Sequence, residues 1–290
     1  MLIYQSGMSI DVLETFCDKF PGRRLNVLLS FGRPDSEKSL LAQRRGTQIA
    51  SLILDSGTYT TNNSRSHNGL NIVVESYIQY LKTVSSSYDF YFNFDSGHGT
   101  DSFGENWQNQ KRIEQVGLTP IPVIHNTENY EVQHYIDRKD KYDYVAIGSV
   151  QANSYETLER PVKTLYDAGI KVHIFGHTTY KIIARLPVYS CDSASWTRRA
   201  GHGDLLYWND LKEQEDKSTT ISLVSKTNRR MTSSRLPDDF LEYMDSVFGY
   251  SYININGLHR QRYREIMNLY FFTELERIAT EKQRELSFTF

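Results

Sequence analysis

The chain has 290 residues, of which 39% are hydrophobic and 23% are charged, and its formal net charge is −2 at pH 7. No apolar stretch approaches the ~18 residues that a membrane-spanning helix needs, so we expect no membrane partner. Two cysteines do not make a disulfide framework, and the N-terminal pattern is not that of a signal peptide, which together favour a cytoplasmic protein. The near-neutral charge gives nucleic acid no general attraction, so binding of that kind requires local basic surface.

Predicted strands and helices alternate along most of the chain. After an amphipathic segment at 10–20, helices are predicted at 36–45, 70–84, 104–116, 131–140, 155–168 and 179–185. Strands are predicted at 25–31, 48–54, 90–94, 121–124, 144–147, 172–175 and 187–190, with 205–208 as a weaker candidate for the eighth. Such alternation is typical of parallel strands joined by right-handed crossovers. It predicts an α/β protein with a (β/α)8 TIM-like barrel, and a doubly wound open sheet is the alternative fold.

The pattern divides the chain into two parts. We expect a barrel catalytic domain at 1–210, which includes the N-terminal helix, and a C-terminal extension at 211–290. The extension begins as a polar loop and continues with helices predicted at 237–248 and 258–280. It contains no cysteine for a zinc subdomain, so we expect a helical extension that packs on the barrel and could contact nucleic acid.

Polar residues and glycines follow the ends of the predicted strands. In a barrel the carboxyl ends of all strands meet at one mouth, where active sites lie, so these residues predict a site. An aspartate there could instead only cap the following helix. The sequence has no His-x-His and no close Cys/His pair, so we expect no metal and no cofactor. The residues are Asp55, Asp95, His125, Gly148, Gly176 with His177, and Asp192.

Several of these positions carry short motifs of a known family. The chain resembles the tRNA-guanine transglycosylase (queuine tRNA-ribosyltransferase) superfamily, most closely the phage-type 7-deazaguanine DNA transglycosylases. It departs from the family in lacking the zinc-binding cysteines, in having Thr60 for a signature glutamine, and in having His125-Asn126 for a base-reading glutamine. The motifs are Asp55-Ser56-Gly57-Thr58-Tyr59, Phe94-Asp95, Ala146-Ile147-Gly148, Ile174-Phe175-Gly176, and Asp192 followed by Thr197-Arg198 and Gly203.

The resemblance implies a pentosyltransferase. Such an enzyme exchanges guanine in nucleic acid, with DNA favoured over tRNA, for a 7-deazaguanine such as 7-cyano-7-deazaguanine through a covalent aspartate intermediate. By resemblance Asp192 is the nucleophile, Asp55 carries the proton, and Asp95 recognises the base. The alternatives are an N-glycoside hydrolase that acts on a modified nucleoside, and a non-catalytic nucleic-acid-binding subunit of a transglycosylase complex. Further predicted contacts to the base are Gly148, His125, Tyr59, Gly176 and Trp196.

Arginines that could hold backbone phosphates gather near Asp192 and in the C-terminal extension. The other interpretation of the last cluster is a solvated helix face, because glutamates follow it closely. The sequence leaves a homodimer open. The arginines are Arg198, Arg199, Arg229, Arg230, Arg260, Arg262 and Arg264.

Overall fold

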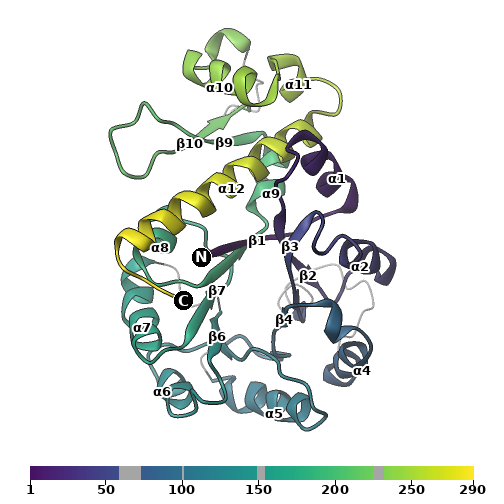
Figure 1. Ribbon diagram of the computed structural model, residues 1–290, viewed down its shortest axis with the longest axis vertical. Helices are drawn as coiled ribbons and strands as arrows, with labels where there is room; N and C mark the ends of the chain where they lie inside the picture. The colour runs from purple at the N-terminus through teal and green to yellow at the C-terminus, as the bar shows by residue number, and fades with distance from the viewer. Residues whose placement is uncertain (59–72, 100, 149–153, 225–231) are drawn as a thin grey trace.

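The computed structural model describes residues 1–58, 73–99, 101–148, 154–224 and 232–290. Its centre is a curled, eight-stranded parallel sheet in the order β4-β3-β2-β1-β8-β7-β6-β5 (Figure 1). The predicted α/β class and parallel sheet are confirmed. The strands are β1 Leu2–Ser6, β2 Leu25–Ser30, β3 Ile49–Asp55, β4 Phe90–Tyr91, β5 Val123–Ile124, β6 Tyr144–Ile147, β7 Lys171–Ile174 and β8 Ser190–Ser193.

The two edge strands of this order also approach each other. Phe92, just after β4, forms an isolated parallel bridge with Ile121, just before β5. The amide of Asn93 donates to the carbonyl of Ile121 at 2.8 Å, and the amide of Ile121 donates to the carbonyl of Tyr91 at 2.8 Å. This bridge brings the ends of the curled sheet together.

One predicted strand does not belong to this sheet. Residues 204–208 form β9 (Asp204–Trp208), which pairs antiparallel with β10 (Ser218–Ser222) in a separate two-stranded sheet. The prediction of an eighth barrel strand at 205–208 is therefore wrong. Its place in the parallel sheet is taken by β1, which lies between β2 and β8.

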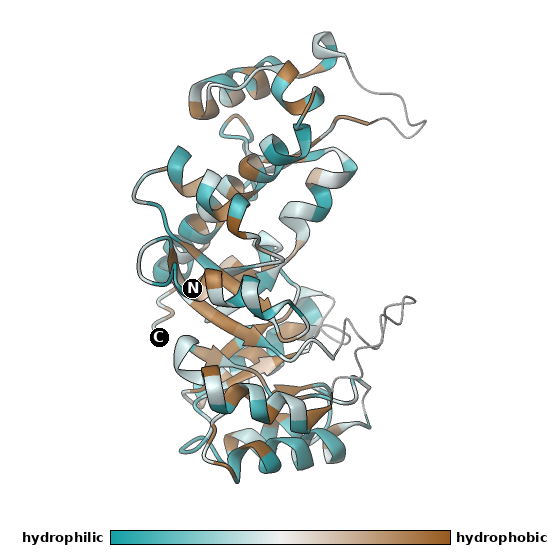
Figure 2. Ribbon diagram, turned by 90° about the vertical axis from the view of Figure 1, so that its right-hand side faces the viewer, coloured by the Kyte–Doolittle hydropathy of each residue, from teal (hydrophilic) through white to brown (hydrophobic). Residues whose placement is uncertain are grey.

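Helices cover the outside of the curled sheet, and apolar side chains fill both of its faces. One cluster of buried residues packs the helices onto the strands. A second cluster fills the inside of the curl with residues such as Tyr4, Leu28, Ile53, Phe92 and Val123. Figure 2 shows hydrophobic residues along the central strands. The helices are α1 Ile10–Lys19, α2 Asp35–Ala42, α4 Val74–Val84, α5 Phe103–Glu114, α6 Glu131–Ile136, α7 Tyr155–Asp167, α8 Tyr180–Arg185 and α9 Ser195–His202.

The C-terminal helices attach to this body through α12 (Arg260–Glu285), which contacts β1, β9, α8 and α9. On α12, Asn268 Nδ2 donates to the carbonyl of Trp196 at 3.0 Å, and Asn268 Oδ1 accepts from the amide of Leu206 at 2.8 Å. The predicted boundary near residue 210 falls between the paired strands β9 and β10, and the division into two parts stays a prediction. The other helices here are α10 (Asp238–Phe248) and α11 (Tyr252–Asn256).

Candidate functional site

Asp55 ends β3 at the carboxyl edge of the sheet. Its Oδ2 accepts a hydrogen bond from the amide of Gly57 at 2.9 Å. Gly57 has a φ of 79°, and a Cβ there would lie 2.4 Å from Ser30 Oγ, so this turn requires glycine. The pKa of Asp55 is raised to about 7, first by burial and then by the charges of Asp192 and Asp95, while the amide of Gly57 opposes the rise. Asp55 therefore carries a proton up to near-neutral pH.

Asp192 lies in β8 at the same edge but has more donors. Ser6 Oγ donates to its Oδ2 at 2.7 Å, and the amide of Gly176 donates to its Oδ1 at 2.9 Å. His173 Nε2 lies 3.5 Å from the same Oδ1. Burial alone raises the pKa of Asp192, but His173, Ser6 and Gly176 together lower it more, so the net shift is downward. Asp192 is therefore held as a carboxylate.

A chain of polar side chains continues from Asp192 into the inside of the curled sheet. His173 Nδ1 lies 2.7 Å from Ser190 Oγ, which lies 2.6 Å from the hydroxyl of Tyr144. His173 and Ser190 are fully buried, and the three residues come from the adjacent strands β7, β8 and β6. Sequence reasoning missed this chain. The one signal for it was a histidine in the middle of the short apolar strand Lys171–Ile174.

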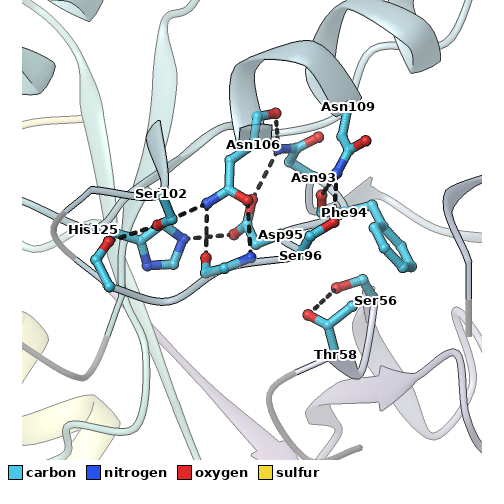
Figure 3. A network of polar contacts seen from close by, with 12 residues as sticks. Ser56, Thr58, Asn93, Phe94, Asp95, Ser96, Ser102, Asn106, Asn109 and His125 are labelled. Atoms are coloured by element: carbon cyan, nitrogen blue, oxygen red, sulfur yellow. Dashed lines mark hydrogen bonds and ion pairs between the residues drawn. The ribbon is translucent and has the colours of Figure 1, made fainter. Parts of the chain in front are cut away.

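Asp95 follows β4 and forms a second aspartate–histidine contact at this edge (Figure 3). Its Oδ2 lies 3.0 Å from His125 Nε2, and its Oδ1 accepts from Asn93 Nδ2 at 2.8 Å. The amide of His125 donates to Glu131 Oε2 at 2.8 Å. Burial lowers the pKa of His125, but Asp95 and then Glu131 raise it more, so the net shift is upward. This contact therefore favours a protonated histidine beside a carboxylate.

Helix α5 fixes the loop that carries Asp95. The carbonyl of Asn106 accepts from Asn93 Nδ2 at 3.0 Å, and Asn106 Nδ2 donates to the carbonyl of Gly97 at 2.8 Å. Asn109 Nδ2 donates to the carbonyl of Phe94 at 3.0 Å. Figure 3 shows these amides between α5 and the loop, with Asp95 and His125 beside them. The carboxylate of Asp95 is thus held by a braced backbone.

The predicted base-binding glycines have other partners in this structure. A Cβ on Gly148 would lie 2.8 Å from His125 Nδ1, and the amide of Gly148 already donates to the carbonyl of Ile124 at 2.9 Å. Gly176, with a φ of 71°, gives its amide to Asp192. The missing side chain of Gly148 makes room for a histidine ring, and the amide of Gly176 orients a carboxylate.

The predicted aromatic contacts also change. Trp196 is 1% exposed, and its Nε1 donates to the carbonyl of Ser6 at 2.8 Å, so it belongs to the core. Burial of the ring of Trp196 on α9, whose Nε1 bonds to the end of β1, argues against the predicted contact with a base. Tyr59 lies outside the described residues. His177, at the end of β7, is half-buried, and burial lowers its pKa.

The predicted phosphate-binding arginines do not form one surface. Arg264 is buried, where Nε donates to the carbonyl of Ile255 at 2.7 Å and Nη1 to that of Ala200 at 3.2 Å. Arg264 thus joins α12 to α11 and α9, which argues against the predicted phosphate contact. Arg262 is partly buried and contacts Thr15 on α1. Arg198, Arg199 and Arg260 are exposed, and Arg229 and Arg230 lie outside the described residues.

The described residues form neither a metal centre nor a membrane span. The described residues contain no group of three or more His, Cys, Asp or Glu side chains that could hold a metal ion. Within the described parts of the chain, no helix combines the length and apolar character needed to cross a membrane. The cytoplasmic location, the nucleic-acid partner and the homodimer stay predictions.

Comparison with known proteins assigns no family to the chain. No family model and no curated protein matches the chain. A racemase from Streptomyces coelicolor A3(2) with bound magnesium matches with a TM-score of 0.44 and 14% identity, over 67% of this chain and 57% of that one. A mandelate racemase/muconate lactonizing protein from Herpetosiphon aurantiacus matches with a TM-score of 0.38 and 13% identity, over 63% of this chain and 50% of that one. This chain thus spans little more than half the length of these two structures.

These comparisons overturn the family prediction. No model and no curated member of that family matches this chain, although the resemblance predicts such a match. The predicted resemblance to the tRNA-guanine transglycosylases is therefore wrong, and so are the guanine exchange, the pentosyltransferase activity, the DNA modification and the two alternatives attached to them. The physical reason is that short runs of aspartate, serine and glycine at strand ends suit the carboxyl edge of many parallel sheets. The shared glycines here serve His125 and Asp192.

Proposed function

We propose that this protein is an enzyme that moves protons on a small polar molecule at the carboxyl edge of its curled sheet. The observation that carries the proposal is the contrast between the surroundings of two carboxyl groups at that edge: Asp55 accepts from the amide of Gly57, whereas Ser6, Gly176 and His173 face Asp192. Asp55 has a pKa raised to about 7, whereas the pKa of Asp192 is lowered. Carboxylates whose surroundings push their pKa values apart are suited to act as a proton donor and an anionic partner.

The fold supports the location of this site. We propose that the sheet closes into a (β/α)8 barrel, because the bridge between Phe92 and Ile121 joins the two edge strands. In such barrels the reacting residues come from the carboxyl ends of several strands. Asp55 on β3, Asp95 after β4 and Asp192 on β8 have this arrangement.

Each acidic group has a role in the proposed reaction. Asp55 gives and takes the proton, because its pKa lies near the working pH. Asp192 accepts a hydrogen bond or stabilises positive charge on the substrate. Asp95, in contact with His125, is the third carboxyl group at this edge of the sheet. Since the edge presents three carboxyl groups, the substrate we expect is a small molecule with N–H or O–H donors, and the reaction is an isomerisation or an elimination.

Proton transfer can be tested without knowing the substrate. A pool of small polar metabolites is incubated with the protein in deuterium oxide, and compounds that gain deuterium are found by mass spectrometry. We expect at least one compound to gain deuterium, with a rate at least about 100-fold lower in Asp55→Asn, since positioned acid–base groups contribute on that order. The matched control is Asp245→Asn, which changes an exposed aspartate on α10 and should keep the parent rate.

Two results would contradict the proposal. One is a pool in which the parent protein labels no compound. The other is labelling that proceeds equally fast in Asp55→Asn, because the proton would then pass through another group. Titration of the carbon-13-labelled aspartates by NMR gives an independent readout, in which one carboxyl group, absent from Asp55→Asn, should titrate with a pKa of about 7.

A further inference from the structure

We propose that His173 is a positioning residue whose ring proton is locked on Nε2 by the hydroxyls of Ser190 and Tyr144, so that it always presents a donor to Asp192. The assignment of the ring proton rests on the geometry of β6, β7 and β8 alone. Its meaning for catalysis rests on the proposed function, in which Asp192 acts as a fixed anion.

The hydrogen-bonded chain that starts at His173 runs through Ser190 and ends at Tyr144. The hydroxyl of Tyr144 lies 2.6 Å from Ser190 Oγ, which lies 2.7 Å from His173 Nδ1. Among the described residues, Ser190 is the hydrogen-bond partner of this hydroxyl. Burial raises the pKa of Tyr144 well above its usual range, so the phenol keeps its proton. That proton has one acceptor within reach, the oxygen of Ser190.

One ordering of the protons suits both ends of this chain of contacts. If Tyr144 donates to Ser190, the hydroxyl of Ser190 must donate to His173 Nδ1. The ring proton then sits on Nε2, which makes no hydrogen bond among the described residues but faces the carboxylate oxygen of Asp192 at 3.5 Å. In the reverse ordering the phenol proton has no acceptor among the described residues, and the lone pair of Nε2 faces the carboxylate. The first ordering is favoured, because it gives the phenol an acceptor and turns a proton, not a lone pair, toward a buried carboxylate.

Among the described residues, the polar groups in contact with the nitrogens of His173 are Ser190 and Asp192, and the rest of the ring packs against aromatic side chains. Its ring lies 4.9 Å from that of Phe92, 4.6 Å from that of Phe175 and 6.3 Å from that of Tyr4, measured between centroids. The titratable groups that face it are Asp192 from β8, Tyr144 from β6 and Tyr4 from β1. The hydroxyl of Tyr4 is engaged elsewhere, 2.9 Å from Ser51 Oγ.

The proposed lock also explains how Asp192 remains ionised in a buried place. Ser6 Oγ, the Gly176 amide and His173 Nε2 all face its two oxygens. The Gly176 amide can only donate, and the Ser6 hydroxyl donates to Oδ2. A neutral histidine nitrogen, in contrast, either donates or accepts, depending on which nitrogen carries the ring proton. Fixing the ring proton on Nε2 makes all three donors, which favours the charged form of the carboxylate.

The direct test is nitrogen-15 NMR of the protein labelled at histidine, with the His173 signals assigned by their loss in His173→Gln. We expect a protonated Nε2 and an unprotonated Nδ1. Tyr144→Phe removes the closing hydroxyl and should yield a mixture of the two tautomers. Tyr4→Phe is the matched control, because it removes a hydroxyl inside the same sheet that bonds to Ser51, and it should leave the tautomer unchanged.

A second measurement follows the carboxylate. In Ser190→Ala and His173→Leu the pKa of Asp192, read from carbon-13 NMR, should rise toward its usual value, and His173→Gln should restore part of the shift through its side-chain amide. A parent ring protonated on Nδ1 would overturn the proposal, as would a tautomer that Tyr144→Phe leaves unchanged. If the tautomer is as expected but the parent labels no metabolite with deuterium, the proposed function fails and the assignment of His173 stands. If labelling depends on Asp55 but the ring proton lies on Nδ1, the proposed function stands and the assignment of His173 fails.

Discussion

Asp55 and Asp192 lie near the carboxyl ends of two strands of the same sheet, yet their surroundings shift their pKa values in opposite directions. Asp55 accepts from the amide of Gly57 and, with a smaller effect, from that of Ser56, and burial with nearby carboxylates raises its pKa to about 7. Asp192 is also buried, but a serine hydroxyl, a backbone amide and a histidine face it, and its pKa is lowered. The difference teaches that the number of donors, more than burial itself, decides whether a carboxyl group at this edge keeps its charge.

The largest expected effect is on stability after replacement of each carboxyl group. Asp55 has a folded-state pKa near 7, above its unfolded value of 3.8, so its contribution to stability is present below the unfolded value and is lost as the pH rises through 7. Asp55→Asn should therefore be more stable than the parent at pH 8, by up to about 4 kcal/mol, since each pKa unit is worth roughly 1.4 kcal/mol. The gain should vanish in acid.

Asp192→Asn should show the opposite sign. The lowered folded-state pKa of Asp192 means that its ionised form contributes stability above the unfolded value. The amide nitrogen of Asn would also direct its hydrogens at the donors on one of the two former oxygens, so a loss of about 1–3 kcal/mol is expected at pH 8. Urea unfolding of both variants between pH 4 and pH 8 is the measurement. Equal changes in the two variants would remove the distinction between the carboxyl groups.

Much of the fold, and the acidic edge, could be predicted from the sequence. The alternation of apolar strands and amphipathic helices gave the parallel sheet, and strand ends identified Asp55, Asp95 and Asp192. Strand β1 was missed because it is short, ends in the polar residues Gln5 and Ser6, and has no helix before it. Strand β9 was misplaced because its apolar pattern is that of a barrel strand, and only its pairing with β10 distinguishes it.

The site was harder to predict, for a physical reason. A motif records which residues are adjacent in sequence, whereas their roles depend on neighbours from other strands. Gly148 makes room for the ring of His125, and His173 acts from inside a strand. Neither relation leaves a trace in a short motif. The family prediction failed for the same reason, because it assigned roles to Gly148, Gly176 and Trp196 from their motifs alone.

Removing one donor should make Asp192 more like Asp55. Ser6→Ala deletes the hydroxyl that donates to Asp192 Oδ2 at 2.7 Å. A hydrogen bond to a charged group contributes about 1.5–3 kcal/mol, so we expect a loss of that order at pH 8 and a rise in the pKa of Asp192. Carbon-13 NMR titration measures the pKa. Ser193→Ala is the control, because the hydroxyl of Ser193 donates to Ser195 at the start of α9 and its loss should leave the pKa of Asp192 unchanged.

The contact between Asp95 and His125 should be disturbed by the addition of a single methyl group at Gly148. In Gly148→Ala the new Cβ would lie 2.8 Å from His125 Nδ1, so the ring must shift from the position in which its Nε2 contacts Asp95. We expect a loss of about 1–3 kcal/mol from overpacking and a fall in the pKa of His125. Gly104→Ala, on α5 with no atom near its Cβ, is the control and should gain up to about 1 kcal/mol. Thermal unfolding and histidine NMR test both variants, and a wild-type His125 titration in Gly148→Ala would contradict the packing argument.

The smallest expected effect concerns pH and two histidines whose surroundings differ as those of Asp55 and Asp192 do. The folded-state pKa of His125 is raised, because Asp95 and Glu131 outweigh the burial that lowers it, whereas burial lowers that of His134. The stability that His125 contributes is thus fully present below its unfolded pKa of about 6.5 and is lost as the pH rises through the raised value. His125→Gln should therefore cost most in acid, by about 1 kcal/mol or less beyond its cost at pH 9. For His134→Gln the free energy of unfolding relative to the parent should instead rise in acid. The reason is that protonation of His134, whose folded-state pKa is lowered, destabilises the folded parent at low pH. Unfolding free energies from pH 5 to pH 9 measure both, and the same slope in the two variants would mean that Asp95 does not stabilise a charged His125.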